Sequence, residues 1–451
     1  MSEATVGIDI GTTSVKAVAA DADGTVLARA RVPHQLLVPG PDHLEHDIDQ
    51  AWRAGVRDAY AQVSAGLTVR AANIAAMVPS LGAVDADGNA MGPGLLYGDA
   101  RGRTAGRASS GPGDSGELLA FLGWLVEHCP GAAGFWPAQA AANHALSGRG
   151  AIDSTTAVTA YPLFDLVGWD AELVAGAGLD DTAKLPDVVS GVEPVGRIVG
   201  TEVLLGGGTI DALAEQLVAG ADSDGDVLVI CGTTLITWAV MDDYVELPGG
   251  GWTIPHTAPG KSLFGGPSNA GGLFLNWARA LAGEGGDDSA VGPRAVPVWL
   301  PYVRGERTPL NRNDLRARLC DLDLTHGPAE LRRAAYEAAA FVVRHHLDLL
   351  AGKARPRRIV ATGGGVRVEA WVQALADGTG LPVDIVAVPE GGALGSAFIA
   401  RCVAGLETSM TDASRWARTA RTVEPDPRWV APCAERYARF RQLTTEATAG
   451  P

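Results

Sequence analysis

Apolar residues occur along this chain in short β-branched runs and in longer segments whose apolar positions lie three and four residues apart. The short runs are typical of strands and the longer segments of helices, so the pattern predicts an α/β protein. One arrangement occurs twice: residues 6–18 and 227–240 each read as apolar strand, Gly-Thr-Thr turn, apolar strand. Because Gly232 follows Gly11 by 221 residues in a chain of 451, we expect two related domains, at residues 1–222 and 223–451.

Helical spacing is clearest in four segments, at residues 47–65, 117–129, 137–146 and 326–350. In the last of these, Thr325 is predicted as the N-cap and Pro328 is tolerated in the first turn. Residues 74–78 are predicted to form a strand, and residues 186–199 an extended connection.

The two Gly-Thr-Thr turns carry groups that suit an anion. Gly11 allows a ligand to approach the backbone closely, and the hydroxyls and amides of Thr12, Thr13 and Ser14 are donors for phosphate oxygens. A carboxylate beside a phosphate needs a cation between them, so Asp9 is predicted to bind Mg²⁺. The alternative is a solvated hairpin, which is equally compatible with the first turn taken alone. The second copy, at Gly232, favours a phosphate site to which both turns contribute.

Three glycines at residues 206–208 are followed by Asp211 and then by an apolar-periodic run. Asp211 is therefore predicted at the N-terminus of a helix, where the helix dipole keeps a carboxylate ionised and able to accept a proton. Most Asp residues in this position only cap their helix, and that alternative stays open at this point.

Other segments have the composition of ligand sites without a diagnostic spacing. Glycine-rich loops enter predicted helices at residues 265–272, 363–366 and 389–397, but none matches a dinucleotide fingerprint or a Walker loop. Asp99 and Arg101 follow a predicted strand and are candidates for binding hydroxyls, although a solvated ion pair is at least as compatible with the spacing.

Composition narrows the class of protein. A hydrophobic content of 47% and a charged content of 20% are typical of globular proteins, and we find no apolar run long enough to span a bilayer. A formal net charge of −16 argues against nucleic acid as a partner. The five cysteines are scattered and the N-terminus does not resemble a signal peptide, so we expect free thiols in the cytoplasm.

Taken together, six ordered blocks of this sequence resemble the FGGY family of carbohydrate kinases, and most closely its xylulokinase branch. The blocks are D-I-G-T-T-S-x-K at 9–16, L-L-Y-G-D-A-R at 95–101, G-G-G-T-I-D-A at 206–212, I-C-G-T-T at 230–234, P-Y-V-R-G-E-R-T-P at 301–309, and G-G-G at 363–365 with E-G-G-A-L-G-S-A at 390–397. The resemblance implies two ribonuclease-H-like domains of the actin/hexokinase ATPase type, flanking a cleft where ATP and a sugar or polyol meet.

The resemblance also implies roles for individual residues. Asp211 would be the catalytic base and would contact the substrate, Asp9 would hold Mg²⁺, and Ser80, Asp99 and Arg101 would lie on the sugar side. The predicted nucleotide- and phosphate-binding residues are Gly11, Thr12, Thr13, Ser14, Lys16, Gly232, Thr233, Thr234, Gly272, Gly363, Gly364 and Gly365. We expect an ATP- and Mg²⁺-dependent kinase that acts on a ketopentose such as xylulose, and we expect a homodimer.

Two segments depart from the family pattern. Residues 78–82 read Val-Pro-Ser-Leu-Gly where many members carry Met-His-Gly, and residues 97–101 read Tyr-Gly-Asp-Ala-Arg where Trp-Asn-Asp-x-Arg is common. Both changes remove polar or stacking groups from the expected sugar side. Two other classes of function therefore stay open: an actin- or chaperone-like ATPase without a sugar substrate, and a lapsed kinase that binds and regulates.

Overall fold

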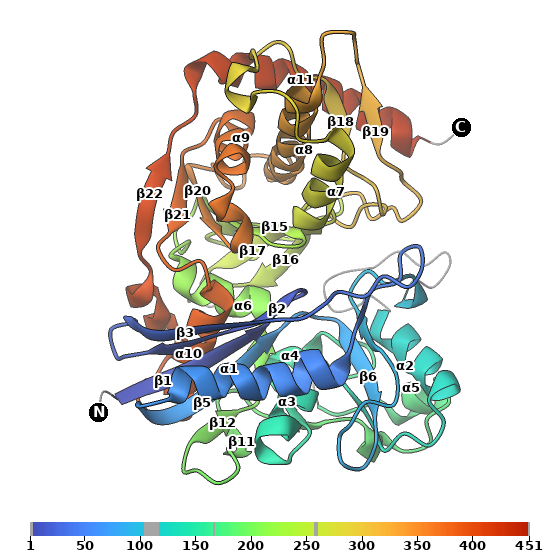
Figure 1. Ribbon diagram of the computed structural model, residues 1–451, viewed down its shortest axis with the longest axis vertical. Coiled ribbons are helices and arrows are strands. Elements are labelled where there is room, and N and C mark those ends of the chain that lie inside the picture. Colours follow the sequence, from blue (N-terminus) through green and yellow to red (C-terminus); the bar gives the residue numbers. More distant parts are fainter. Residues whose placement is uncertain (1–2, 103–116, 166, 257–259, 450–451) are drawn as a thin grey trace. The chain divides into compact units, whose positions relative to one another are not determined.

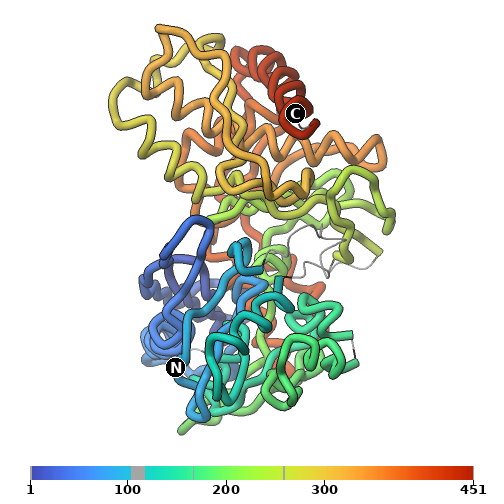
Figure 2. The backbone as a smooth tube through the Cα atoms, turned by 90° about the vertical axis from the view of Figure 1, so that its right-hand side faces the viewer, coloured from blue at the N-terminus to red at the C-terminus, as the bar shows by residue number. Residues whose placement is uncertain are grey.

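The computed structural model describes residues 3–102, 117–165, 167–256 and 260–449, and the chain divides into two compact units. Unit 1 contains Met1–Val218 and Glu390–Trp416, and unit 2 contains Ala219–Pro389 and Ala417–Pro451. The predicted division at residue 222 is close to the first crossing of the chain, but residues 390–416 belong to unit 1 and not to the C-terminal domain. In Figure 2 this late segment, orange to red, lies among the blue and green segments of unit 1.

Unit 1 is built on a mixed sheet in the order β11-β12-β5-β1-β2-β3, with β13 also paired to β5 (Figure 1). Its strands are β1 (Glu3–Ile10), β2 (Ser14–Ala20), β3 (Val26–Pro33), β5 (Thr68–Ala76), β11 (Pro194–Arg197), β12 (Leu204–Gly206) and β13 (Thr209–Ile210). The first three strands are antiparallel, whereas β5 runs parallel to β1 and to β12.

Alternate side chains of β1 enter two different environments, because successive residues of a strand point to opposite faces. Val6, Ile8 and Ile10 are completely buried in one core with α1 (Gly55–Ser64) and α3 (Ala138–Ser147). On the other face lies α10 (Gly391–Val403), where Thr5 donates its hydroxyl to the Ala397 carbonyl at 2.9 Å. The segment that crosses back from unit 2 therefore supplies the second layer of this sheet.

A smaller sheet, in the order β4-β7-β6-β8, and short helices complete unit 1. Leu81, Phe121, Leu122 and Phe135 belong to its separate core. These elements are β4 (Glu45–His46), β6 (Ser80–Val84), β7 (Gly94–Leu96), β8 (Gly134–Trp136), a two-stranded pair of β9 (Ala151–Asp153) and β10 (Asp187–Val189), α2 (Glu117–His128), α4 (Ser154–Val158), α5 (Ala171–Gly176) and α6 (Asp211–Ala219).

Unit 2 has its own mixed sheet, in the order β16-β17-β15-β14-β20-β21-β22 (Figure 1). Its strands are β14 (Asp226–Cys231), β15 (Leu235–Met241), β16 (Trp252–Pro255), β17 (Ser262–Ser268), β20 (Arg358–Thr362), β21 (Val383–Val386) and β22 (Thr419–Val423). The helices are α7 (Gly272–Ala282), α8 (Pro328–Asp348), α9 (Glu369–Thr379) and α11 (Pro427–Thr448), and a small hairpin is formed by β18 (Val298–Leu300) and β19 (Arg318–Cys320).

The two sheets share one topology. In each, an antiparallel hairpin is followed by a third antiparallel strand on one side and by two parallel strands on the other: β3-β2-β1-β5-β12 in unit 1, and β17-β15-β14-β20-β21 in unit 2. A Gly-Thr-Thr turn joins the first two strands in both. The repeat predicted from the sequence and the two-domain α/β class are thus confirmed.

The predicted helices are found with shifted ends. Residues 47–65 form a π-helical turn, Asp49–Ala54, and then α1. Helix α8 has Pro328 in its first turn as expected, but the predicted N-cap is wrong: Gly327 takes that position, and the Glu330 side chain accepts from the Gly327 amide at 2.9 Å. Among the described residues, no helix is long and apolar enough to cross a membrane.

Candidate active site

The first Gly-Thr-Thr turn closes the β1–β2 hairpin. The Gly11 amide donates to the Ser14 carbonyl at 3.1 Å, and Asp9 pairs with Lys16 across the two strands. Thr13 is exposed, whereas Thr12 and Ser14 are buried. The Thr12 hydroxyl lies 3.0 Å from the Tyr97 hydroxyl, and the Ser14 hydroxyl accepts from Arg31 at 3.3 Å. Of the three hydroxyls proposed for phosphate, that of Thr13 is thus the one directed outward.

Asp211 reaches the same edge of the sheet from the other side of β5. Ile10 of β1 and Ile210 of β13 are both in register with Ala76, and both strands run parallel to β5. Gly11 and Asp211 are the residues that follow, so they lie two strand spacings apart, about 10 Å. Asp211 is the first residue of α6, as predicted, and its Oδ1 accepts from the Ala212 amide at 2.7 Å.

Side-chain amides hold the glycine-rich segment that leads to Asp211. From α3, Gln139 donates to the carbonyls of Ala76 and Thr209 at 3.2 and 3.1 Å. One turn later, Asn143 donates to the Gly207 carbonyl at 2.8 Å. The Gly208 amide donates to the side chain of Asn73, which is completely buried in β5. These bonds satisfy polar groups that would otherwise be buried without partners, and they fix the approach to Asp211.

Asp9 lies against the start of α10. It is 5% exposed, and a Cβ placed on Gly392 would come within 3.0 Å of its carboxylate carbon. The Lys16 ammonium lies 3.3 Å from Asp9 Oδ2. Attraction to Asp9 outweighs burial and raises the pKa of Lys16, to which the charges of Glu215 and Glu390 also contribute. A helix N-terminus and an ammonium group thus both stabilise negative charge at this position.

The single carboxylate of Asp9 fits a magnesium ion that is held mainly by the phosphate groups of a bound nucleotide. Mg²⁺ prefers oxygen donors and is commonly bound through one or two carboxylates together with substrate phosphates. Asp9 supplies one carboxylate beside the turn. Within the described ranges, no group of three or more His, Cys, Asp or Glu side chains is arranged to hold a metal ion.

Asp99 and Arg101 bind one another rather than facing outward. Asp99 is completely buried, and its oxygens accept from the Leu44 amide at 2.6 Å and from the Arg101 guanidinium at 2.9 and 2.7 Å. Arg101 also donates to Glu45 at 2.7 Å. Burial alone would raise the pKa of Asp99, but the hydrogen bonds from Arg101 and Leu44 lower it. The pair therefore fixes residues 42–45 against this loop, and its contact with a sugar stays a prediction.

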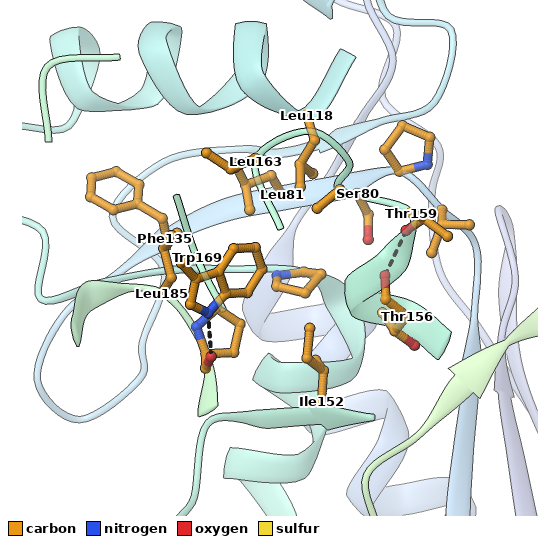
Figure 3. Close-up of a pocket in the computed structure, with 15 residues that line it drawn as sticks. Ser80, Leu81, Leu118, Phe135, Ile152, Thr156, Thr159, Leu163, Trp169 and Leu185 are labelled. Atoms are coloured by element: carbon orange, nitrogen blue, oxygen red, sulfur yellow. Dashed lines mark hydrogen bonds between the residues drawn. The ribbon is translucent and has the colours of Figure 1, made fainter. Parts of the chain in front are cut away.

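Ser80 lines a small apolar cavity (Figure 3). It is 1% exposed, and its hydroxyl accepts from the Ala138 amide at 3.1 Å. The cavity, of about 20 Å³, is enclosed largely by apolar side chains, including Leu81, Phe135, Leu163 and Trp169. A space of this size holds about one water molecule and is too small for a sugar ring. A role for Ser80 in substrate binding thus also stays a prediction.

In unit 2, the second Gly-Thr-Thr turn is backed by the start of α7. The Gly272 amide donates to the Gly232 carbonyl at 2.8 Å, and the Leu273 amide donates to the Thr233 carbonyl at 3.0 Å. Two amides of the first turn of α7 are thereby satisfied by the protein itself. A Cβ on Gly271 would lie 2.3 Å from the Thr234 carbonyl carbon, which explains why glycine is needed at this contact.

The triple glycine at 363–365 lies beside the same turn. Ile230 of β14 pairs with Thr362 of β20, so Gly363 follows directly next to Cys231. Gly363 has φ 87°, and a Cβ there would also lie 2.9 Å from the Cys231 carbonyl oxygen. Gly364 is exposed, and a Cβ on it would meet no atom within 4 Å. The open position next to the turn is therefore Gly364, while Gly363 is required by the backbone.

The P-Y-V-R-G-E-R-T-P segment contacts the stretch predicted as a glycine-rich loop at residues 265–272, of which residues 265–268 are in fact part of strand β17. Glu306 is 1% exposed and accepts from the Ser268 hydroxyl at 2.8 Å and from the amides of Asn269 and Arg307 at 2.9 and 2.7 Å. Burial nevertheless raises the pKa of Glu306 to about 7. Thr308 donates to the Pro267 carbonyl at 2.9 Å, so the segment holds the end of β17 and the first residue of the loop that follows it.

Two family models match this chain. The N-terminal domain of the FGGY family of carbohydrate kinases matches residues 4–107, and the C-terminal domain of the same family matches residues 228–404. Together the two matches span more than half of the 451 residues. The chain belongs to the FGGY family of carbohydrate kinases.

Similar proteins support the same family. The chain is 25% identical to a probable L-xylulose kinase from Pasteurella multocida, with 98% of each chain covered. It is 26% identical to a xylulose kinase from Escherichia coli, over 97% of this chain and 98% of the relative. The structure of a ligand-bound xylulose kinase from Lactobacillus acidophilus, 20% identical, superposes with a TM-score of 0.81 over 99% of each chain, which shows the common fold.

Sequence reasoning missed several side chains that position the site of this FGGY kinase. Gln139 and Asn143 are two amides spaced i, i+4 on an Ala-rich helix, and this spacing on a buried face is a signal that could have identified them. Asn73 lies among the buried apolar residues at the C-terminal end of β5, where a buried amide needs specific partners. Tyr97 was noted only as a departure from the family pattern, and its contact with Thr12 could not be inferred because the two residues are 85 positions apart in the sequence.

Proposed function

We propose that this kinase transfers the γ-phosphoryl group of ATP to a hydroxyl of a sugar or polyol, with a ketopentose such as xylulose as the first candidate. The observation that carries the proposal is the common register of Ile10 and Ile210 with Ala76. This register brings the turn at residues 11–14 and the carboxylate of Asp211 to one edge of the sheet of unit 1. The names of the relatives support a ketulose as the substrate class.

In the proposed mechanism, Asp211 accepts the proton of the sugar hydroxyl. The hydroxyl oxygen forms a bond to the γ-phosphorus, and the bond to the bridging oxygen breaks, so that the electron pair leaves with ADP. Thr13, Thr233 and Gly364 are proposed to contact phosphate oxygens because their side chains or backbones are accessible. When bound beside Asp9, Mg²⁺ would neutralise phosphate charge.

A coupled assay of ADP release tests this proposal. Pentuloses, hexuloses, glycerol and tetritols are screened at fixed MgATP, and sugar-dependent ADP release with a phosphorylated product is expected for at least one ketose. ATP hydrolysis that no sugar changes would contradict the proposal and would favour an actin- or chaperone-like ATPase.

One observation favours a second candidate, a lapsed kinase that binds a sugar without phosphorylating it. Ser80 and Asp99, both proposed for the sugar side, are buried and already bonded to protein groups. Calorimetric titration separates the two candidates, since binding of a sugar without any turnover would support the second.

Two further parts of the proposal concern the cellular setting. We propose a cytoplasmic enzyme, because all five cysteines are free thiols. We also propose a homodimer, which light scattering of the purified protein tests directly.

A further inference from the structure

A buried chain of hydrogen bonds ends on the carbonyl of Thr12. The Trp52 indole nitrogen lies 3.0 Å from His46 Nδ1, and His46 Nε2 lies 2.8 Å from the Thr12 carbonyl oxygen. The side chain of Thr12 has a second partner, because its hydroxyl lies 3.0 Å from the Tyr97 hydroxyl. His46 and Trp52 are completely buried, and Thr12 and Tyr97 are 8% and 9% exposed. Thr12 is thus held at two points from inside unit 1.

The partners of His46 fix its tautomer. An indole N–H can only donate, so Nδ1 of His46 accepts, and the single ring proton is on Nε2 and is donated to Thr12. Burial, and to a smaller extent the neighbouring His34 ring, lower the pKa of His46 to about 4. The imidazole therefore stays neutral near pH 7 and keeps one donor directed at the turn.

This bond sets the orientation of the peptide group between Thr12 and Thr13. The peptide is trans, and in a planar trans peptide the carbonyl and the following amide point in opposite directions. Because the Thr12 carbonyl points inward to His46, the Thr13 amide points away from it. The exposed Thr13 side chain belongs to the same residue. An outward amide and an outward hydroxyl are the pair of donors that a phosphate oxygen needs.

We propose that His46 and Tyr97 are positioning residues for phosphoryl transfer, which hold Thr12 so that the Thr13 amide and hydroxyl face the transferred phosphate. This inference rests on the function proposed above. It assigns to segments 45–52 and 95–97 a role in setting the turn, in addition to any contact with the sugar.

The test compares His46→Gln with His46→Met. The two side chains are similar in length and volume, but glutamine can still donate to the Thr12 carbonyl and accept from Trp52, whereas methionine can do neither. In His46→Met we expect kcat/KM for ATP to fall by about tenfold, with the KM for the sugar nearly unchanged. In His46→Gln it should stay within about threefold of the wild type.

Hydrogen–deuterium exchange gives a second measurement that does not depend on turnover. Exchange in residues 11–14 should be faster in His46→Met than in His46→Gln. If His46→Met does not fold, Tyr97→Phe, which deletes only the hydroxyl facing Thr12, replaces it, and the same faster exchange is expected.

Equal kinetics and equal exchange in the methionine and glutamine variants would overturn the positioning role, even in an active kinase. An equal loss of activity in both variants would also overturn it, because packing alone would then be the cause. If the wild type releases no ADP with any sugar, the proposed function fails and the role in phosphoryl transfer fails with it, and the exchange comparison then decides only whether His46 and Tyr97 fix the conformation of the turn.

Discussion

Ile10 and Ile210 lie opposite the same residue of β5, Ala76, although 200 positions separate them in the sequence. Both residues end strands that run parallel to β5, so the residues that follow them emerge at the same edge of the sheet. Gly11 of the phosphate turn and Asp211 are the next residues. In open α/β sheets, ligands bind outside the carboxyl ends of the strands, and this register makes that edge the centre of the proposed reaction.

The two turns give a prediction that separates ligand contact from stability. Thr13→Val and Thr233→Val should raise the KM for ATP or lower kcat, while the thermal midpoint stays close to that of the wild type. Thr12→Val is a comparison for stability alone, because its buried hydroxyl faces Tyr97 and its loss should lower the free energy of unfolding by about 1 kcal/mol. Wild-type kinetics in both Thr13→Val and Thr233→Val would contradict the nucleotide role of the turns.

A second prediction concerns the contact between α10 and α6. A Cβ on Gly395 would lie 1.8 Å from the Ala214 carbonyl oxygen, in the helix that begins with Asp211. Gly395→Ala should therefore force the helices apart, lower the free energy of unfolding by about 1–3 kcal/mol and reduce kcat. Urea unfolding and the coupled assay measure the two effects.

Gly123→Ala is the control for this prediction. Gly123 lies inside α2, and the nearest atom to an added Cβ there is 3.9 Å away. Alanine should stabilise that helix by up to about 1 kcal/mol and leave the kinetics unchanged. The close contact at Gly395 would be refuted if both alanine variants were equally stable.

These glycines show what could be inferred from the sequence and what could not. The repeated turn and the helix that starts at Asp211 are encoded in a few neighbouring residues, and both predictions are confirmed. The glycines of residues 390–397 were expected to lie against a ligand. In the structure, Gly392 and Gly395 contact Asp9 and Ala214 of unit 1. Such contacts depend on a crossing of the chain that no local pattern specifies.

Hydrogen-bond partners were equally hidden in the sequence. The composition of the first turn indicated three outward hydroxyls, yet those of Thr12 and Ser14 face Tyr97 and Arg31. Thr325 was a reasonable N-cap by residue type, but the N-cap is Gly327, two residues later, and the helix begins at Pro328. In both cases residue type gave the capacity to bond, and tertiary structure decided the partner.

A third prediction concerns Glu306 and pH. Its pKa in the folded protein is raised by burial to about 7 from an ordinary value of 4.5, so the folded state binds this proton more tightly than the unfolded state does. Glu306 therefore makes its whole contribution to the free energy of unfolding below pH 4.5, the ordinary pKa. This contribution is lost as the pH rises through the folded-state pKa of about 7. Its total is about 3 kcal/mol, from about 1.4 kcal/mol per pKa unit.

Glu306→Gln removes this dependence. Glutamine can accept from the amides of Asn269 and Arg307 and donate to the Ser268 hydroxyl without carrying a charge. Relative to the wild type, the variant should gain stability between pH 5 and pH 8, which urea unfolding at the two pH values measures. A difference between the two proteins that does not change with pH would show that Glu306 titrates normally.

The last prediction concerns Asp211, for which the catalytic and the capping roles give opposite results. Asparagine keeps the size of the side chain and can still accept from the Ala212 amide, so Asp211→Asn should leave the thermal midpoint nearly unchanged. It cannot accept the proton of the sugar hydroxyl, and kcat should fall by about 10² to 10⁴. If Asp211 only caps α6, Asp211→Asn should be nearly silent, whereas Asp211→Ala should lower the free energy of unfolding by about 1 kcal/mol. Because the two roles predict opposite orders of effect, turnover and thermal midpoint measured on both variants decide between them, and full activity of Asp211→Asn would eliminate Asp211 as the base.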